Sequence, residues 1–188
     1  MSFYRLPRLP RRRFLRLLGG VSATSLIPLQ FATGAGKTVR IVEFTPFGLR
    51  AGVTEVEKIQ KPIAEWKKQL TPQQFAIARQ AGTEAPGTGE YANNHDDGLY
   101  HCVCCDTVLF DSKTKFESGT GWPSFWQPAA KENVTVHQDL SLGMQREEVL
   151  CKRCDAHLGH VFDDGPPPTH LRYCMNSASL KFVPRRKA

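Results

Sequence analysis

Acidic residues are missing from the first 42 positions of this 188-residue sequence, in which the earliest is Glu43. Six arginines lie within the first 16 residues, and three further basic residues occupy positions 185–187. Residues 17–184 carry 16 basic and 18 acidic side chains, a balance of −2, although the whole chain has a formal charge of +7. The positive charge therefore belongs to the two ends of the chain, and it does not predict a nucleic-acid partner.

A long hydrophobic run is also missing. The uncharged stretch 17–36 is interrupted by glycines and by Pro28, whereas a membrane-spanning helix needs about 20 predominantly apolar residues. The preceding sequence RRRFLR at 11–16 resembles a twin-arginine export signal, and small residues near Gly36 suit a cleavage site. We therefore expect residues 1–36 to be a signal segment and the protein to be periplasmic or secreted. The alternatives are an uncleaved N-terminal membrane anchor and a mitochondrial-type leader.

A complete phosphate-binding loop is missing as well. The sequence GAGKT at 34–38 matches the end of the G-x-x-x-x-G-K-[ST] pattern, but Phe31 occupies the position of its first glycine. The sequence therefore predicts no nucleotide site.

Short elements are expected after the signal segment. The sequence TPQQ at 71–74 predicts a helix with a capping box and proline in its first turn, ending at Gly82. Residues 38–44 predict a strand, and residues 45–60 an N-terminal extension or linker. Short apolar runs between turn-forming residues predict further strands at 100–104, 107–110, 134–137, 148–150 and 180–183. These runs favour a mainly β domain.

Six cysteines fall into three groups. Two C-x-x-C pairs, Cys102 with Cys105 and Cys151 with Cys154, have the spacing of zinc knuckles. Four thiolates would complete a tetrahedral zinc site with no open position, which indicates a structural role. Two disulfides are the alternative for an exported protein. Metal is favoured because twin-arginine substrates cross the membrane already folded. Cys104 is an alternative ligand, a buried apolar residue or a redox thiol.

Cys174 stands alone and is a candidate nucleophile. This role requires a thiolate, and we expect Arg172 and nearby imidazoles to lower the pKa of the thiol. His157 and His160 follow the second knuckle and form either a catalytic pair or, for one of them, a core hydrogen bond. Trp122 lies in a Gly/Pro-rich segment and is either a pocket wall or a core residue.

Together these motifs resemble the type B methionine sulfoxide reductases. The similarity covers about residues 58–184, and its most specific parts are CxxC at 151–154, HLGHVFDDGP at 157–166 and RYCMNS at 172–177. WKKQLTP at 66–72, GEY at 89–91, CxxC at 102–105 and GTGWPSF at 119–125 also match. The resemblance implies two antiparallel β-sheets of the β-tent type with short N-terminal helices, one structural Zn²⁺ per chain, and selectivity for the R epimer of methionine sulfoxide.

The resemblance also implies roles for individual residues. Cys174 would attack the sulfoxide sulfur and become a sulfenic acid, while His160 would protonate the oxygen. His157 would assist as its neighbour, Asp164 would orient it, and Asn176 and Arg172 would complete the catalytic set. Trp122 and Phe162 are the predicted substrate-binding residues, with the indole ring of Trp122 receiving the methyl group.

One position departs from the family pattern. Many relatives carry a resolving cysteine just before the GWPSF motif, where this chain has Thr120. The sulfenic acid would therefore be reduced by an external thiol, such as a thioredoxin-like protein, or by Cys104. Expected partners are oxidised proteins or peptides, this reductant and the twin-arginine translocation machinery.

The expected domain organisation is a signal (1–36), an extension (37–57), a reductase domain (58–184) and a basic tail (185–188), in a monomer. The alternatives to an enzyme are a zinc-ribbon module that binds protein or nucleic acid, and a thiol sensor of oxidation without turnover.

Overall fold

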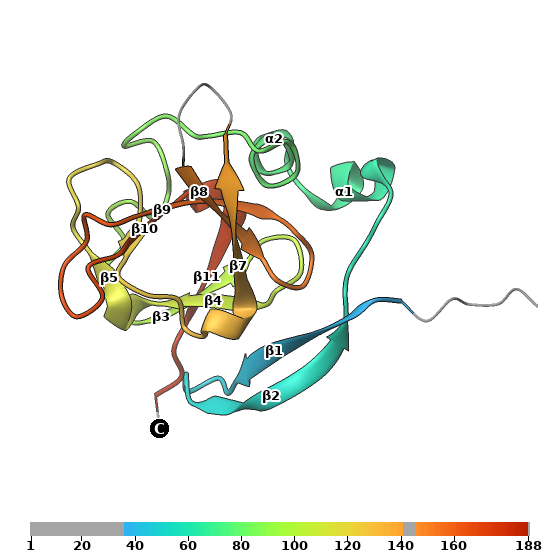
Figure 1. Ribbon diagram of the computed structural model, residues 1–188, viewed down its shortest axis with the longest axis horizontal. Coiled ribbons are helices and arrows are strands. Elements are labelled where there is room, and N and C mark those ends of the chain that lie inside the picture. The colour runs from blue at the N-terminus through green and yellow to red at the C-terminus, as the bar shows by residue number, and fades with distance from the viewer. Residues whose placement is uncertain (1–35, 141–145, 188) are drawn as a thin grey trace, which may run out of the picture. The chain divides into compact units, whose positions relative to one another are not determined.

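Strands dominate the computed structural model, which describes residues 36–140 and 146–187 (Figure 1). Its three sheets have the strand orders β1-β2, β5-β6-β10-β9-β8-β7 and β11-β3-β4, and every pairing is antiparallel. The expected mainly β fold with antiparallel sheets is confirmed. Apart from Gly36, the predicted signal segment lies outside the described residues.

The elements have the following bounds. The strands are β1 (Thr38–Phe44), β2 (Arg50–Glu57), β3 (Gly98–Cys102), β4 (Val108–Asp111), β5 (Lys115–Phe116), β6 (Ser124–Phe125), β7 (Val134–Asp139), β8 (Arg146–Cys151), β9 (His157–Phe162), β10 (Arg172–Met175) and β11 (Leu180–Pro184). The helices are α1 (Ile63–Gln69) and α2 (Pro72–Gln80), with short 3-10 turns η1 (Ser112–Thr114), η2 (Lys131–Asn133) and η4 (Ser177–Ser179).

Aromatic side chains fill the space between the two larger sheets. Phe110 of β4 stacks on Phe125 of β6 with ring centroids 4.5 Å apart, and Tyr100 of β3 meets the same ring edge-on at 5.1 Å. These three side chains are completely buried. Apolar burial is the main stabilising contribution to such a core. It holds β10 and β6 of the six-stranded sheet against the three-stranded sheet β11-β3-β4.

Helix α2 begins where the sequence predicts. The Thr71 hydroxyl accepts a hydrogen bond from the Gln74 amide at 3.2 Å, and the Gln74 side chain accepts one from the Thr71 amide at 3.0 Å. This capping box satisfies two amide groups that have no partner inside the helix. Ala81 ends the helix in a left-handed conformation, with φ of 53°, one residue before the expected Gly82.

The expected linker at 45–60 contains a strand. β2 pairs with β1 along its length, from Thr38 opposite Glu57 to Val42 opposite Val53. Most side chains of β2 are exposed on both faces, so the apolar alternation by which a strand is recognised in a sequence is weak. In Figure 1 this hairpin lies below the larger sheets, and the two helices lie to the upper right.

A buried asparagine attaches the hairpin to the rest of the protein. The Asn133 side chain accepts a hydrogen bond from the Val42 amide at 2.7 Å and donates to the carbonyls of Val42 (2.9 Å) and Val108 (2.7 Å). Ile41 and Val42 are themselves buried. The hairpin is therefore packed against η2 and β4.

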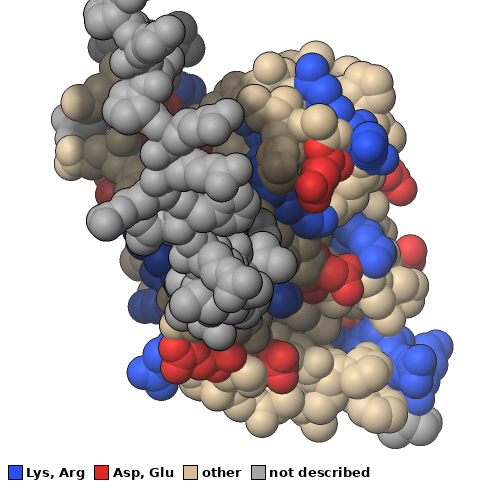
Figure 2. All heavy atoms as spheres, turned by 90° about the vertical axis from the view of Figure 1, so that its right-hand side faces the viewer, with Lys and Arg blue, Asp and Glu red and all other residues tan. Residues whose placement is uncertain are grey.

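Charged side chains of both signs are interspersed on the face shown in Figure 2. Within the described ranges, none of the helices is long and apolar enough to span a bilayer.

Candidate active site and metal centre

Strand register brings the candidate nucleophile next to a histidine and a serine. Cys174 lies on β10, opposite His160 of β9 on one side and Ser124 of β6 on the other. Opposed residues of antiparallel strands have their Cβ atoms about 5 Å apart on the same face. Residues at 124, 160 and 174 therefore share one face of the six-stranded sheet.

A cavity of about 150 Å³ opens at this face. The sequence-predicted residues Cys174, His160, Trp122, Phe162 and Asn176 all line it. Its remaining lining residues are Thr83, Arg146, Gly159 and Met175. The Trp122 indole nitrogen donates to the Glu84 carbonyl at 3.1 Å, which fixes the ring. Of the two sequence interpretations of Trp122, the structure supports the pocket wall.

The carboxylate that contacts His160 is not the predicted one. His160 Nε2 lies 2.9 Å from Oδ2 of Asp139 at the end of β7, and the same oxygen accepts from Arg146 at 2.7 Å. Asp164, expected to orient His160, instead forms two 2.8 Å hydrogen bonds with the guanidinium of Arg172. That expectation is wrong in its geometry, and Asp139 is a site residue that the sequence motifs did not reveal.

Arg172 is held between an acid and an aromatic ring. Its guanidinium carbon lies 4.4 Å from the centroid of the Phe162 ring, a favourable cation–π geometry. Its hydrogen bonds to Asp164 hold the pKa of that carboxyl below its usual range. The interaction keeps a fixed positive charge close to Cys174.

His157 supports His160 rather than lining the cavity. Its side chain is buried, its Nδ1 lies 2.6 Å from the Glu148 carboxylate, and its ring meets the His160 ring edge-on with centroids 5.5 Å apart. Burial lowers the pKa of His157, while the hydrogen bond with Glu148 opposes that effect. The structure thus joins two acid–imidazole pairs, of which His160 with Asp139 is the one at the cavity.

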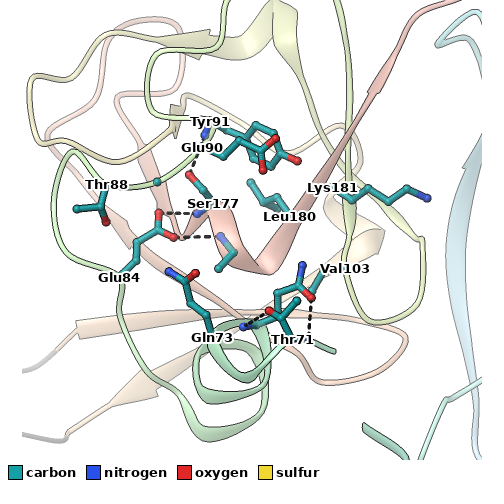
Figure 3. Close-up of a pocket in the computed structure, with 13 residues that line it drawn as sticks. Thr71, Gln73, Glu84, Thr88, Glu90, Tyr91, Val103, Ser177, Leu180 and Lys181 are labelled. Carbon is teal, nitrogen blue, oxygen red and sulfur yellow. Dashed lines mark hydrogen bonds between the residues drawn. The ribbon is translucent and has the colours of Figure 1, made fainter. Parts of the chain in front are cut away.

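Asn176 and Glu84 order the segment that follows Cys174. The buried Asn176 side chain accepts from the Glu84 amide at 3.1 Å and donates to the Leu158 carbonyl at 3.2 Å. The Glu84 carboxylate, 4% exposed, accepts from the amides of Ser177 at 2.7 Å and Ala178 at 3.0 Å. Figure 3 shows these two bonds at the wall of a separate cavity of about 460 Å³. Sequence reasoning missed Glu84, which has no motif of its own.

Burial opposes ionisation of the Cys174 thiol. Burial raises its pKa above the ordinary value, while hydrogen bonds from Thr120 and Ser124 and the charge of Arg172 lower it. Arg172 therefore acts in the expected direction, but burial has the larger effect. The Thr120 hydroxyl lies 3.9 Å from Cys174 Sγ.

The four predicted ligands form one cluster. The sulfurs of Cys102, Cys105, Cys151 and Cys154 all lie within 4.8 Å of one another. Cys102 Sγ is 3.6 Å from that of Cys154, and Cys105 Sγ is 3.5 Å from that of Cys151. Zn–S bonds of about 2.3 Å imply about 3.8 Å between the sulfurs of a regular tetrahedron, so this arrangement fits a metal ion. All four are free thiols, which does not support the disulfide alternative.

The two knuckles have the same backbone construction. Cys102 accepts from the Asp106 amide and Cys151 from the Asp155 amide, both at 2.9 Å. Both aspartates are left-handed, with φ of 61° and 54°. Because Cys102 ends β3 and Cys151 ends β8, a bound metal would join the two larger sheets. Cys104 lies outside the four-sulfur group and is 3% exposed, which agrees with the buried apolar interpretation.

Comparisons with known proteins agree with this arrangement. The model of the SelR domain family matches residues 70–184. This chain belongs to the SelR domain family. It is 56% identical to the peptide methionine sulfoxide reductase MsrB of Pseudomonas syringae pv. syringae, over 69% of this chain and 99% of that protein. The protein of that name from Pseudomonas aeruginosa PAO1 is 58% identical, over 69% of this chain and 98% of its own length.

A third relative of the same name, from Thioalkalivibrio sulfidiphilus, is 57% identical over 64% of this chain and 88% of its own length. The matched SelR domain contains the four clustered cysteines and every residue of the cavity described above. The hairpin β1–β2 and helix α1 precede it.

Proposed function

We propose that this SelR-domain protein is a peptide-methionine (R)-S-oxide reductase, which uses thiols to reduce methionine R-sulfoxide in oxidised proteins to methionine. The observation that carries the proposal is the arrangement of Cys174, His160 and Trp122 around one small cavity. Its support is a sequence more than half identical to proteins named peptide methionine sulfoxide reductase MsrB.

Substrate binding follows from the chemistry of the cavity walls. A methionine sulfoxide side chain has an apolar methyl group on one side of its sulfur and a polar oxygen on the other. The Trp122 ring offers an apolar surface for the methyl group, and Phe162 extends it beneath Arg172. The oxygen then faces His160, which makes this site selective between the two epimers.

Catalysis begins with attack of Cys174 Sγ on the sulfoxide sulfur. The oxygen is a poor leaving group until it is protonated, and His160 supplies that proton. The sulfur–oxygen bond of the substrate then breaks and the hydroxyl group is transferred to Cys174 Sγ, while the transient sulfur–sulfur bond breaks and its electron pair returns to the methionine sulfur. Methionine is thereby reduced by two electrons, and Cys174 is oxidised to a sulfenic acid. Asp139 holds the His160 ring and stabilises its positive charge.

An external thiol restores the enzyme. It attacks the Cys174 sulfenic acid, releasing water and forming a mixed disulfide, which a second thiol reduces. Thr120 has no thiol with which to resolve the intermediate. We therefore propose a thioredoxin-like or other dithiol reductant as partner, oxidised proteins or peptides as substrates, and a monomeric enzyme.

Zinc is the metal that we propose for the four-cysteine cluster. Four thiolates at tetrahedral spacing are typical of structural zinc sites. Zn²⁺ held by Cys102, Cys105, Cys151 and Cys154 would stabilise the junction of the two sheets, at the far end of β8 from Arg146. Since all four ligands come from the protein, no open position is left for chemistry.

Export by the twin-arginine route is the proposed fate of the chain. The support is the RRRFLR sequence at 11–16, followed by 20 uncharged residues. Cleavage near residue 36 would leave residues 37–188 with 19 basic and 18 acidic side chains, a net charge of +1. Mass spectrometry of periplasmic and membrane fractions distinguishes a cleaved enzyme from a membrane-anchored one.

One assay tests the proposed activity. Blocked methionine R- and S-sulfoxides are incubated separately with reduced, metal-loaded protein and dithiothreitol, and methionine is measured. We expect turnover of the R epimer, and its loss in Cys174→Ser with unchanged metal content. Activity on neither epimer would refute the proposal. Stoichiometric oxidation of Cys174 without turnover would favour a sensor instead. No observation favours the zinc-ribbon binding module.

A further inference from the structure

Three hydroxyl groups form a hydrogen-bonded chain that ends at Cys174. The Ser124 and Ser118 hydroxyl oxygens are 2.7 Å apart, those of Ser118 and Thr120 are 2.8 Å apart, and the Thr120 oxygen lies 3.9 Å from Cys174 Sγ. Ser124 Oγ also lies 3.2 Å from the carbonyl oxygen of Trp122. The chain thus runs without a break from a backbone carbonyl to the reacting sulfur.

The turn between β5 and β6 creates this arrangement. Ser124 is completely buried and pairs directly with Cys174 in the sheet. Gly119 and Gly121 have φ of 71° and 89°, values that residues with a Cβ adopt at a cost. They allow the turn to fold back, so that the Thr120 hydroxyl lies near the sulfur and Ser118 lies beside Thr120. Neither Ser118 nor Thr120 lines the substrate cavity.

The hydroxyl hydrogen bonds between Ser124 and Cys174 can all point in either of two directions. Each hydroxyl has one proton to donate. When Cys174 is a thiol, it donates to Thr120, Thr120 to Ser118, Ser118 to Ser124, and Ser124 to the Trp122 carbonyl. When Cys174 is a thiolate, Ser124 donates to Ser118, Ser118 to Thr120, and Thr120 to the sulfur. Both directions satisfy every hydroxyl within the chain.

We propose that this chain is a reversible hydrogen-bond switch in which Thr120 stabilises the attacking thiolate of Cys174, with Ser118 and Ser124 as positioning residues. The inference rests on the proposed reductase function and adds Thr120 to its catalytic residues. No proton passes along the chain, because each hydroxyl keeps its own proton and only rotates about its C–O bond. The thiol proton leaves on the other side, to the imidazole of His160, which delivers it to the sulfoxide oxygen.

This switch counteracts the effect of burial, which raises the pKa of the Cys174 thiol. A buried thiol resists ionisation because the thiolate loses its hydration, and the charge of Arg172, which is paired with Asp164, only partly offsets that effect. A hydroxyl donor stabilises the anion without adding a charge that would hold the thiol ionised at all times. Ser124 is completely buried and pairs directly with Cys174, so it keeps this part of the chain away from water and also favours the thiolate.

Alkylation of Cys174 by iodoacetamide tests the inference without any sulfoxide. The rate is measured from pH 6 to 10 on metal-loaded protein, by mass spectrometry of the peptide that contains Cys174. We expect Thr120→Val, which preserves shape but removes the hydroxyl, to raise the apparent pKa by about one unit. This shift corresponds to about tenfold slower alkylation near neutral pH. Thr120→Ser should restore the rate to within about twofold, and Ser118→Ala should have a smaller effect than Thr120→Val.

The control is Thr135→Val, the same chemical change on β7 outside both the cavity and the chain, which should leave the alkylation profile unchanged. In the reductase assay, Thr120→Val should lower kcat about tenfold with little change in KM. An alkylation profile of Thr120→Val identical to that of the unaltered protein would overturn the inference while leaving the proposed function intact. A shifted profile in a protein that reduces neither epimer would support the switch and refute the function.

Discussion

The Nε2 atom of His160 and the Oδ2 atom of Asp139 lie 2.9 Å apart although the two residues are 21 positions apart in the sequence. The strand order β7-β8-β9 brings them together across an intervening strand. This carboxylate lies where it can stabilise an imidazolium, whereas the carboxylate of Asp164 is already bound twice by Arg172. The two acids therefore have separable effects on the reaction.

Asp139→Asn should lower kcat about tenfold or more, because general acid catalysis contributes about 10²–10⁴-fold and depends on the orientation and charge of the acid. KM should change little, since Asp139 does not line the cavity. Steady-state kinetics with methionine R-sulfoxide measure both constants.

Asp164→Asn is the matched comparison, and it should act mainly through Arg172. We expect a higher KM and a smaller loss of kcat than in Asp139→Asn. If instead Asp139→Asn behaved like the parent and Asp164→Asn lost most of its kcat, the carboxylate that acts on His160 would be Asp164.

Cys151→Ser should release the metal and destabilise the fold, because metal binding and folding are coupled in such sites. The loss of even about 4 kcal/mol lowers the melting temperature of a domain of this size by about 10 °C. Plasma mass spectrometry and calorimetry give the two readouts. Cys104→Ser is the control, and it should retain one metal per chain.

Cys104→Ser also tests whether Cys104 reduces the sulfenic acid of Cys174. With Cys104 outside the four-sulfur cluster, turnover with dithiothreitol should be unchanged. A variant that accumulates the Cys174 sulfenic acid would instead identify Cys104 as the resolving cysteine.

Thr120→Cys should convert recycling from an external to an internal step. The Thr120 hydroxyl lies 3.9 Å from Cys174 Sγ, so small side-chain rotations suffice for an S–S bond of about 2.05 Å. One equivalent of methionine R-sulfoxide should then produce an intramolecular disulfide, detected as the loss of two thiols on titration. Retention of a sulfenic acid that dimedone labels would contradict this expectation.

Asn133→Ala should destabilise the protein by about 2–4 kcal/mol, because it leaves buried backbone groups of the hairpin and of β4 without partners, at about 1–3 kcal/mol each. Its neighbour Glu132 forms an exposed ion pair with Arg50 at 2.8 Å, and such pairs contribute about 0–1 kcal/mol. Urea unfolding of Asn133→Ala and Glu132→Gln compares them directly. Equal destabilisation of both would contradict the role given to Asn133.

Acidification should destabilise the fold partly through His157. Its pKa is lowered by burial, so the unfolded chain binds the proton at higher pH than the folded protein does. The contribution of His157 to the free energy of unfolding is therefore fully present above the ordinary histidine pKa of about 6.5, and it decreases as the pH falls below that value. His157→Asn should reduce the difference in unfolding free energy between pH 7 and pH 5. An unchanged difference would show that other groups are responsible.

Local sequence predicted the parts of the site that depend on spacing. The two C-x-x-C pairs predicted the four-sulfur cluster, TPQQ at 71–74 predicted the start of α2, and Cys174 with His160 and Trp122 proved to share a cavity. Asp139, Glu148 and Glu84 could not be found in this way. Asp139 and Glu148 meet their histidines because of the register of neighbouring strands, and Glu84 meets its partners because the loop after α2 packs against the segment after Cys174. Contacts of this kind produce no motif in a short stretch of sequence.

The pairing of Leu180 with Cys102 has a consequence for assembly. Strand β3, which ends at Cys102, pairs with β11, and β11 comes after Cys174 in the sequence. The amide of Val103, within the first C-x-x-C turn, also donates to the carbonyl of Ser179 at 3.0 Å. A chain interrupted before β11 would lack the frame for its first two cysteines. Retention of a metal by the four clustered cysteines should therefore depend on the folding of the segment that carries Cys174.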